Sequence, residues 1–109
     1  MRALIAKEIR YRLHPGVERE AFLEAPEAVE PELETIAGYI RRELLEEDDG
    51  WFRDVVHWRS IEGAERSVEA IAAKPGCQTC IALMDASSMQ IAHLRIVQEH
   101  FACVVPEPS

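Results

Sequence analysis

The 109-residue sequence lacks the features that mark several large classes of protein. No apolar run approaches the roughly 20 residues that a transmembrane helix needs, so we expect no membrane partner. Basic residues are outnumbered: 12 lysines and arginines against 20 aspartates and glutamates give a net charge of −8, which argues against binding to nucleic acid or anionic membranes. There are only five glycines and no glycine-rich phosphate loop, so nucleotide binding has no obvious site.

Cysteine is scarce as well. Three cysteines, an odd number, favour reduced thiols, and the charges within residues 1–8 are unlike a signal peptide. We therefore expect a cytoplasmic protein. No zinc-binding spacing or nucleophile elbow occurs, and the acidic run at residues 46–49 lacks the ligand spacing of a calcium loop. The sequence thus predicts neither a metal nor a cofactor.

What is present is one domain, expected over residues 1–103 with a tail at 104–109. Alternating apolar residues predict strands at 4–14, 39–46, 51–59 and 89–99. Asp49-Gly50 between the second and third strands predicts a hairpin. Helical spacing predicts a helix at 17–25 and another that Ser60 caps, with a second helical piece after Pro75-Gly76. Pro26 and Pro31 predict an irregular stretch up to residue 37, in which Pro31 could open a short second helical turn as its first residue.

This order, strand–helix–strand–strand–helix–strand, predicts an α+β ferredoxin-like sandwich: a four-stranded antiparallel sheet with its helices on one face. The alternation assigns one set of residues to the helix-facing side: Ile5, Ile9, Leu13, Phe52, Val56, Trp58, Ala92, Leu94 and Ile96. It assigns the other set to the bare side: Glu8, Arg10, Arg12, Arg53, Val55, His57, Ile91, His93, Arg95 and Val97. Because the bare side holds so much apolar surface, we predict that a second copy covers it, with Val55, His57, Ile91 and His93 at the dimer interface.

Several short motifs resemble one family. Pro15-Gly16 before the first helix, Gly38–Ile40 opening the second strand and Val55–Ser60 ending the third are similar to the dimeric α/β-barrel superfamily, especially its antibiotic-biosynthesis-monooxygenase-like branch. The resemblance covers about residues 3–100. It implies a homodimer whose two sheets form a barrel, with a pocket between sheet and helices. It also implies, as one of several activities in the superfamily, cofactor-independent oxygenation of a hydrophobic or aromatic small molecule. The sequence contains no asparagine, so the Asn-Trp-His set of the haem-degrading members is not present.

Trp58 and Asp54 share one face of the third strand, and the monooxygenase-like members often have a pocket tryptophan there. Together with Tyr11 they are our candidate ligand-binding residues: an indole wall, a phenol and a carboxylate that could act as a base. The alternative is a core tryptophan with a carboxylate paired to an arginine. A non-catalytic binding or assembly module is the alternative for the whole chain.

Two further sets of residues have alternative interpretations. His57 and His93, assigned to one face, could form an acid–base pair or hold a metal, which makes His57 a second catalytic candidate beside Asp54. The alternative is a network of hydrogen bonds and ion pairs at a dimer interface. Cys77 and Cys80 follow Pro75-Gly76 at a helix start and resemble a redox pair locally, but both continue an apolar stripe, which is typical of packing.

Overall fold

The structure, a computed structural model, describes residues 4–102 and 107–108. The predicted boundary between domain and tail at residue 103 falls outside these residues. Along the chain the elements are β1 (Leu4–Arg12), α1 (Arg19–Glu24), a 3-10 turn (Ala25–Ala28), α2 (Val29–Leu33), β2 (Tyr39–Glu46), β3 (Trp51–Trp58), α3 (Ile61–Ala72), α4 (Pro75–Ile81), a 3-10 turn (Ala86–Ser88) and β4 (Gln90–Ile96). Among the described residues, no helix is both long and apolar enough to cross a membrane.

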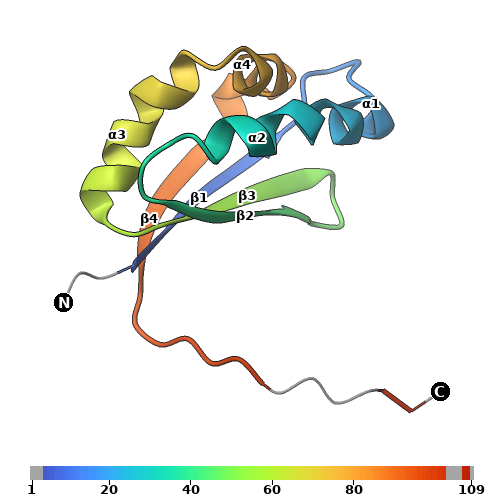
Figure 1. The fold of residues 1–109 in the computed structure, drawn as a ribbon. Helices are drawn as coiled ribbons and strands as arrows, with labels where there is room; N and C mark the ends of the chain where they lie inside the picture. The colour runs from blue at the N-terminus through green and yellow to red at the C-terminus, as the bar shows by residue number, and fades with distance from the viewer. Residues whose placement is uncertain (1–3, 103–106, 109) are drawn as a thin grey trace.

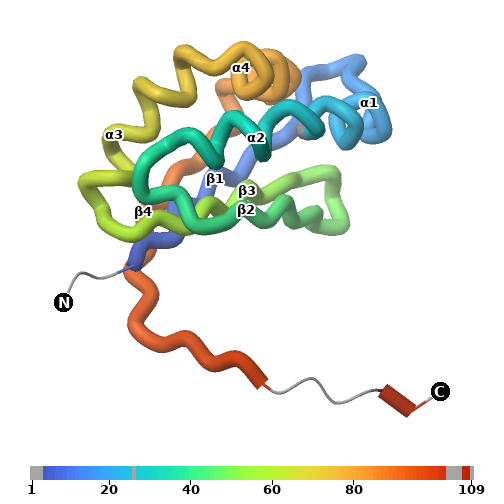
Figure 2. The backbone as a smooth tube through the Cα atoms, in the orientation of Figure 1, coloured from blue at the N-terminus to red at the C-terminus, as the bar shows by residue number. Residues whose placement is uncertain are grey.

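The four strands form one antiparallel sheet in the order β2-β3-β1-β4. All four helices lie on the same side of this sheet, and the segment after β4 leads away from the domain (Figures 1 and 2). The predicted ferredoxin-like α+β fold is therefore confirmed. One face of the sheet is covered by helices, and the other is open.

Local signals explain most of the element boundaries. Gly50 has a φ of +79° in the β2–β3 turn, and Gly38 has a φ of +90° just before β2, a backbone region that favours glycine. The Ser60 hydroxyl accepts a hydrogen bond from the Gly63 N–H at 3.1 Å and caps α3, as predicted. β1 ends at Arg12, two residues earlier than predicted, and β4 is shorter at both ends.

The stretch predicted to be irregular is largely helical. The chain continues from α1 through a 3-10 turn into α2, where Pro31 occupies the third position. The first turn of a helix has N–H groups without intrahelical partners, so a proline there removes no hydrogen bond. The prediction of irregular backbone was therefore wrong, whereas the short helical turn expected at Pro31 is present and begins two residues earlier, at Val29.

The register of β4 corrects the predicted faces. Ile91 pairs with Ile9, His93 with Lys7 and Arg95 with Ile5, so these three β4 residues lie on the helix-facing side. Ala92, Leu94 and Ile96 lie on the open side instead. A shift of one residue exchanges the two faces of a strand, and β4 has apolar residues on both. The assignments in β1 and β3 are correct: Val56 and Trp58 are buried under the helices.

Two hydrophobic clusters fill the space between sheet and helices. The larger contains Tyr11, Phe22 and Phe52, whose rings contact one another, together with residues of α2 and α4. The smaller surrounds Trp58 near the start of β2 and includes Ala64 of α3. The cavity described next reaches residues of both clusters, so it lies where they meet.

Candidate functional site

A cavity of about 200 Å³ lies between the sheet and the helices. Its wall is almost entirely aliphatic or sulfur-containing, and residues from β1, β2, β3, α2, α3 and α4 contribute to it. The lining residues are Ile9, Val29, Leu33, Arg42, Asp54, Val56, Ile71, Cys77, Cys80, Ile81, Met84 and Met89. Only Arg42 and Asp54 among them are charged, so the electrostatics of the cavity depend on this pair.

Asp54 and Arg42 form a nearly buried ion pair at the cavity wall. Arg42 Nε donates to Asp54 Oδ1 at 2.5 Å and Nη2 donates to Oδ2 at 3.0 Å, with side-chain exposures of 12% and 8%. The Tyr11 hydroxyl donates a third hydrogen bond to Oδ2, at 3.0 Å. Both carboxylate oxygens are thus occupied, which makes Asp54 a poor free base and a good clamp for Arg42.

The environment fixes the protonation of the two donors. Burial, and then the charge and hydrogen bond of Asp54, raise the pKa of Tyr11, so the phenol stays a neutral donor. Burial lowers the pKa of Arg42, but the hydrogen bond and charge of Asp54 outweigh it and raise the pKa overall. The alternative of a carboxylate paired with an arginine is therefore confirmed for Asp54.

The two α4 thiols line the opposite wall. Cys77 and Cys80 are buried and not joined in a disulfide. Burial, helped by a hydrogen bond and the charge of Glu32, raises the pKa of Cys77 to about 11. The Glu32 carboxylate also accepts the N–H groups of Gly76 and Cys77, at 2.9 and 2.7 Å, and so occupies the start of α4. A reactive thiol needs a lowered pKa, so this environment favours packing over redox chemistry.

Trp58 lies in the smaller cluster. Its side chain is fully buried, the ring of Tyr39 packs edge-on at 5.8 Å, and no described residue forms a hydrogen bond with the indole Nε1. Of the three residues predicted to bind a ligand, only Asp54 lines the cavity. Tyr11 donates a hydrogen bond to Asp54, and Trp58 lies two residues after the lining residue Val56 in β3. Their ligand-binding role stays a prediction.

His57 lies on the open face, away from this cavity. Its Nε2 is 3.1 Å from Glu43 Oε1, and it pairs with Ala6, whereas His93 pairs with the next residue, Lys7. Adjacent residues of a strand point to opposite faces, so the prediction that His57 and His93 share a face was wrong. Within the described chain, no group of three or more histidine, cysteine, aspartate or glutamate residues is placed to hold a metal ion.

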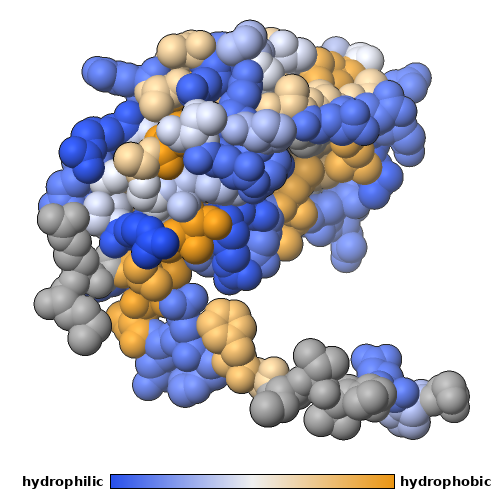
Figure 3. Space-filling model, in the orientation of Figure 1, coloured by the Kyte–Doolittle hydropathy of each residue, from blue (hydrophilic) through white to orange (hydrophobic). Residues whose placement is uncertain are grey.

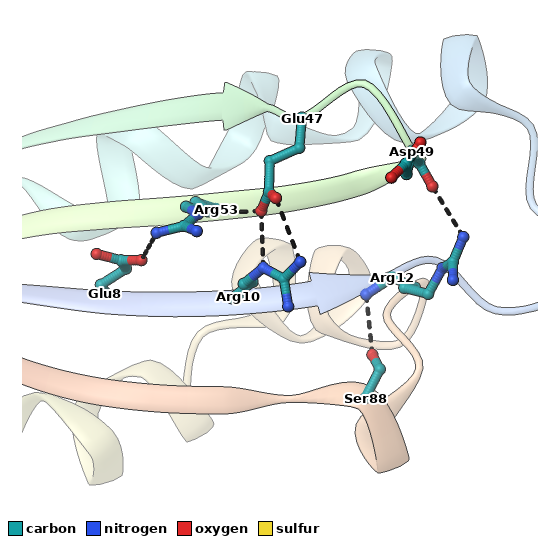
Figure 4. A network of polar contacts seen from close by, with 7 residues as sticks. All are labelled: Glu8, Arg10, Arg12, Glu47, Asp49, Arg53 and Ser88. Carbon is teal, nitrogen blue, oxygen red and sulfur yellow. Dashed lines mark hydrogen bonds and ion pairs between the residues drawn. The ribbon is translucent and has the colours of Figure 1, made fainter.

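The rest of the open face holds a network of ion pairs (Figure 4). Arg53 donates to Glu8 at 2.5 Å and to Glu47 at 3.0 Å, and Arg10 also donates to Glu47 at 2.7 Å. These hydrogen bonds lower the pKa of Glu47 to about 2. The Arg10 guanidinium stacks on the ring of Trp51 at 3.9 Å. Within this network each of the charged side chains Glu8, Arg10, Glu47 and Arg53 has a partner of opposite charge.

Sequence reasoning missed Arg42 and Lys7. In the β2–β3 register Arg42 pairs with Val56 and Leu44 with Asp54, which makes Arg42 and Asp54 diagonal neighbours on one face. The Asp49-Gly50 turn sets that register, so counting back from the turn could have found the pair. Lys7 alternates with Ile5 and Ile9 on β1, and its place on the buried face was visible in the same pattern.

Comparison with known proteins finds the same fold at low identity. No family model matches the sequence, and no curated protein matches it. A variant of SnoaB, a cofactor-independent oxygenase from Streptomyces nogalater, superposes with a TM-score of 0.69 at 15% identity, over 89% of this chain and 96% of that one. A dimeric ferredoxin-like protein from an uncultured marine organism gives 0.70 at 16%, over 93% and 94%.

A provisionally assigned antibiotic biosynthesis monooxygenase from Bordetella bronchiseptica gives a TM-score of 0.69 at 17% identity, over 89% of this chain and all of that one. A protein of unknown function from Nitrosomonas europaea gives 0.68 at 14%, over 94% and 97%. These structural neighbours thus include a cofactor-independent oxygenase, a dimeric ferredoxin-like protein and a protein of unknown function, and their likeness to this chain establishes the fold.

Proposed function

We propose that this protein binds a compact hydrophobic or aromatic small molecule in the cavity between the sheet and the helices. The observation that supports this proposal is an apolar cavity with one fixed ion pair, Arg42–Asp54, in its wall. Binding sites for small molecules are typically concave and apolar, with few well-placed polar groups. Arg42 is the polar anchor, because Asp54 and the sheet hold its guanidinium in place.

The size of the cavity restricts the ligand. Its volume, about 200 Å³, is somewhat above the roughly 150 Å³ of an engineered cavity that binds benzene. It is below the roughly 300 Å³ at which pockets for drug-sized ligands begin. A molecule of one or two rings therefore fits, whereas a larger polycyclic ligand requires the helices to move.

Cofactor-independent oxygenation is the second candidate, and it rests on the fold shared with SnoaB. In such a reaction the substrate is the only reductant: a CH₂ group loses two hydrogens and four electrons to O₂, so that one oxygen atom enters the product as a carbonyl and the other leaves as water. Arg42 would stabilise an oxyanion that forms on the substrate. The alternative is binding without turnover. Oxygen uptake with one- and two-ring phenols, corrected for uncatalysed oxidation, separates the two.

A pair of variants on α3 tests the binding proposal. Ile71 lines the cavity, whereas Val68, one turn earlier, is 55% exposed. In a ¹⁹F NMR screen of small fluorinated aromatics, Ile71→Phe should fill the cavity and weaken every hit by about tenfold or more, since each buried ring loses its site. Val68→Phe should leave the affinities unchanged. No hits, or hits that bind both variants equally, would contradict the proposal.

We further propose a homodimer through the open face that holds Val55 and His57. Leu45 and Leu94 on this face are 46% and 48% exposed, and the ion-pair network around Arg53 presents both signs of charge. A two-fold axis would place such a mixed surface against itself. Ile91 and His93 lie on the other side of the sheet, so the register removes them from this interface.

Two free thiols in the described chain support the proposed cytoplasmic location.

A further inference from the structure

Lys7 is a buried cation for which the described residues provide no partner. Its residue is 7% exposed, on the helix-facing side of β1 between Ile5 and Ile9, and no described residue forms a hydrogen bond or ion pair with it. Trp58 Nε1 is the one side-chain nitrogen or oxygen of the described chain that is both fully buried and unpaired. The Lys7 nitrogen does not belong to that class, so it is not completely enclosed.

Trp58 is a second unsatisfied donor close to Lys7. Lys7 pairs with Val56 across β1 and β3, and Trp58 lies two residues beyond Val56 on the same face. Diagonal neighbours of this kind are about 7–8 Å apart at Cα, within reach of a lysine and an indole. Buried donors without acceptors are rare in folded proteins and call for an explanation such as a ligand or a water molecule.

The neighbouring strand places two basic residues next to Lys7. On β4, His93 lies directly opposite Lys7, and Arg95 lies opposite Ile5; both are exposed and neither has an ion-pair partner in the described chain. Asp54 faces the same side from β3, but Arg42 and the Tyr11 hydroxyl occupy its oxygens. The ionisable residues of α3 are all exposed: Glu62, Glu65, Arg66 and Glu69. Lys7 and Arg95, with His93 beside them, thus form a basic patch on the helix-facing side for which the described residues provide no acidic partner.

We propose that Lys7 and Trp58 form a carboxylate-binding subsite, in which Lys7 pairs with the anion and the indole N–H donates to one of its oxygens. This inference rests on the proposed binding function and specifies the ligand: a one- or two-ring molecule with a carboxylate. Lys7 and Trp58 are not lining residues of the cavity, but Ile9 and Val56 line it and flank Lys7, so the proposed subsite adjoins the cavity behind these two side chains. Arg42 is already neutralised by Asp54, which leaves Lys7 as the stronger attraction for an anion.

The empty subsite is unfavourable, and a carboxylate would relieve it. Burial lowers the pKa of Lys7, because the charged ammonium is poorly solvated there. An anion beside it stabilises the charged form and raises the pKa again. Binding of a carboxylate should therefore be strongest where Lys7 is protonated and should weaken as the pH rises through the lowered pKa.

Benzoate and benzamide provide a matched pair of probes, since they have similar shape and differ in charge. By calorimetry at pH 7, the wild-type protein should bind benzoate about tenfold or more tightly than benzamide, as expected for a hydrogen bond to a charged group. Lys7→Met keeps the aliphatic stem and should abolish this preference while leaving benzamide affinity unchanged. The only other lysine is Lys74, so Lys74→Met is the control and should behave as the wild type.

The preference for benzoate should also decline at alkaline pH in the wild type and in Lys74→Met, whereas Lys7→Met should show no such change. Equal affinity for the two probes, or an undiminished preference in Lys7→Met, would overturn the inference. Benzamide binding that Ile71→Phe abolishes would still support the cavity, whereas binding of neither probe contradicts both proposals.

Discussion

Replacing Asp54 by alanine is the most direct test of how the cavity wall is built. The carboxylate accepts two hydrogen bonds from Arg42 and one from Tyr11. Its removal leaves a guanidinium that is 12% exposed and a phenol hydroxyl in a fully buried side chain without their acceptor. The loss of stability is therefore set by the uncompensated partners more than by the lost contact itself.

The expected magnitude follows from this environment. Breaking a buried ion pair by removing one partner typically costs about 3–5 kcal/mol. Arg42 borders a cavity that water can enter, so the lower end applies, and we expect a loss of about 3 kcal/mol for Asp54→Ala. Removing the stranded cation as well, in Asp54→Ala/Arg42→Met, should recover about 2 kcal/mol. Tyr11→Phe alone should cost about 1 kcal/mol, the usual net value of one hydrogen bond.

Urea unfolding at a fixed protomer concentration measures these differences, because any dimer makes the midpoint depend on concentration. Asp54→Ala, Arg42→Met and the double variant form a double-mutant cycle with the wild type. The Arg42–Asp54 coupling energy should account for most of the stability that Asp54→Ala loses. If Asp54→Ala costs less than about 1 kcal/mol, the pair is solvated and Arg42 is not a fixed anchor. If the double variant is no more stable than the single one, the stranded guanidinium is not the cause.

Three further predictions concern α4 and the open face. A Cβ on Gly76 would lie 2.8 Å from the Cβ of Ala28, the last residue of the 3-10 turn before α2. Because this contact is too short, Gly76→Ala should lower the free energy of unfolding by about 1–3 kcal/mol. Because burial raises the pKa of Cys77 to about 11, both α4 thiols should resist a maleimide until urea is added; rapid native labelling would support a redox role. Hydrogen bonds from Arg10 and Arg53 lower the pKa of Glu47 to about 2. The contribution of Glu47 to the free energy of unfolding is therefore complete above its unfolded pKa of about 4.3 and disappears as the pH falls toward 2. At that pH, Glu47→Gln and the wild type should become equally stable.

Sequence reasoning succeeded where one short segment decides the structure. The Asp49-Gly50 turn, the Ser60 cap and the alternation in β3 each depend on interactions within a few residues, so the hairpin and α3 could be predicted. The helical path through Pro31 could not be predicted with the same certainty, because a proline is equally compatible with a first helical turn and with irregular backbone. Only packing of Val29 and Leu33 against the sheet decides between them.

The candidate site was predicted only in part for a related reason. Asp54 and Trp58 were placed on the correct face, because β3 alternates clearly between buried and less buried residues. β4 has Ile91 on one face and Leu94 and Ile96 on the other, so its own sequence pattern does not show which face lies under the helices. The register of its pairing with β1 determines this. The error moved Ile91 and His93 to the wrong side of the sheet and concealed the basic patch around Lys7.

The proposed dimer can be tested with two residues of β4 that differ mainly in the face they occupy. Leu94 is 48% exposed and lies on the open face opposite Ala6, whereas Ile91 is 59% exposed and lies on the helix-facing side. Val55 is less suitable, because Glu8 and Glu43 flank it and a carboxylate there would be repelled even within one protomer. In Figure 3, hydrophobic side chains also gather where β4 leaves the body of the domain.

Leu94→Asp should weaken the dimer by about tenfold or more, because association would desolvate a carboxylate that has no partner. Ile91→Asp introduces the same charge on the same strand but outside the proposed interface, so its association constant should equal that of the wild type. Sedimentation velocity over a range of protomer concentrations measures the association constants of the wild type, Leu94→Asp and Ile91→Asp. Because each exposed site tolerates a charge in the monomer, a difference between the variants reports on the interface and not on folding. A wild-type monomer at micromolar concentration, or equal dissociation of both variants, would show that the open face is not where two copies meet.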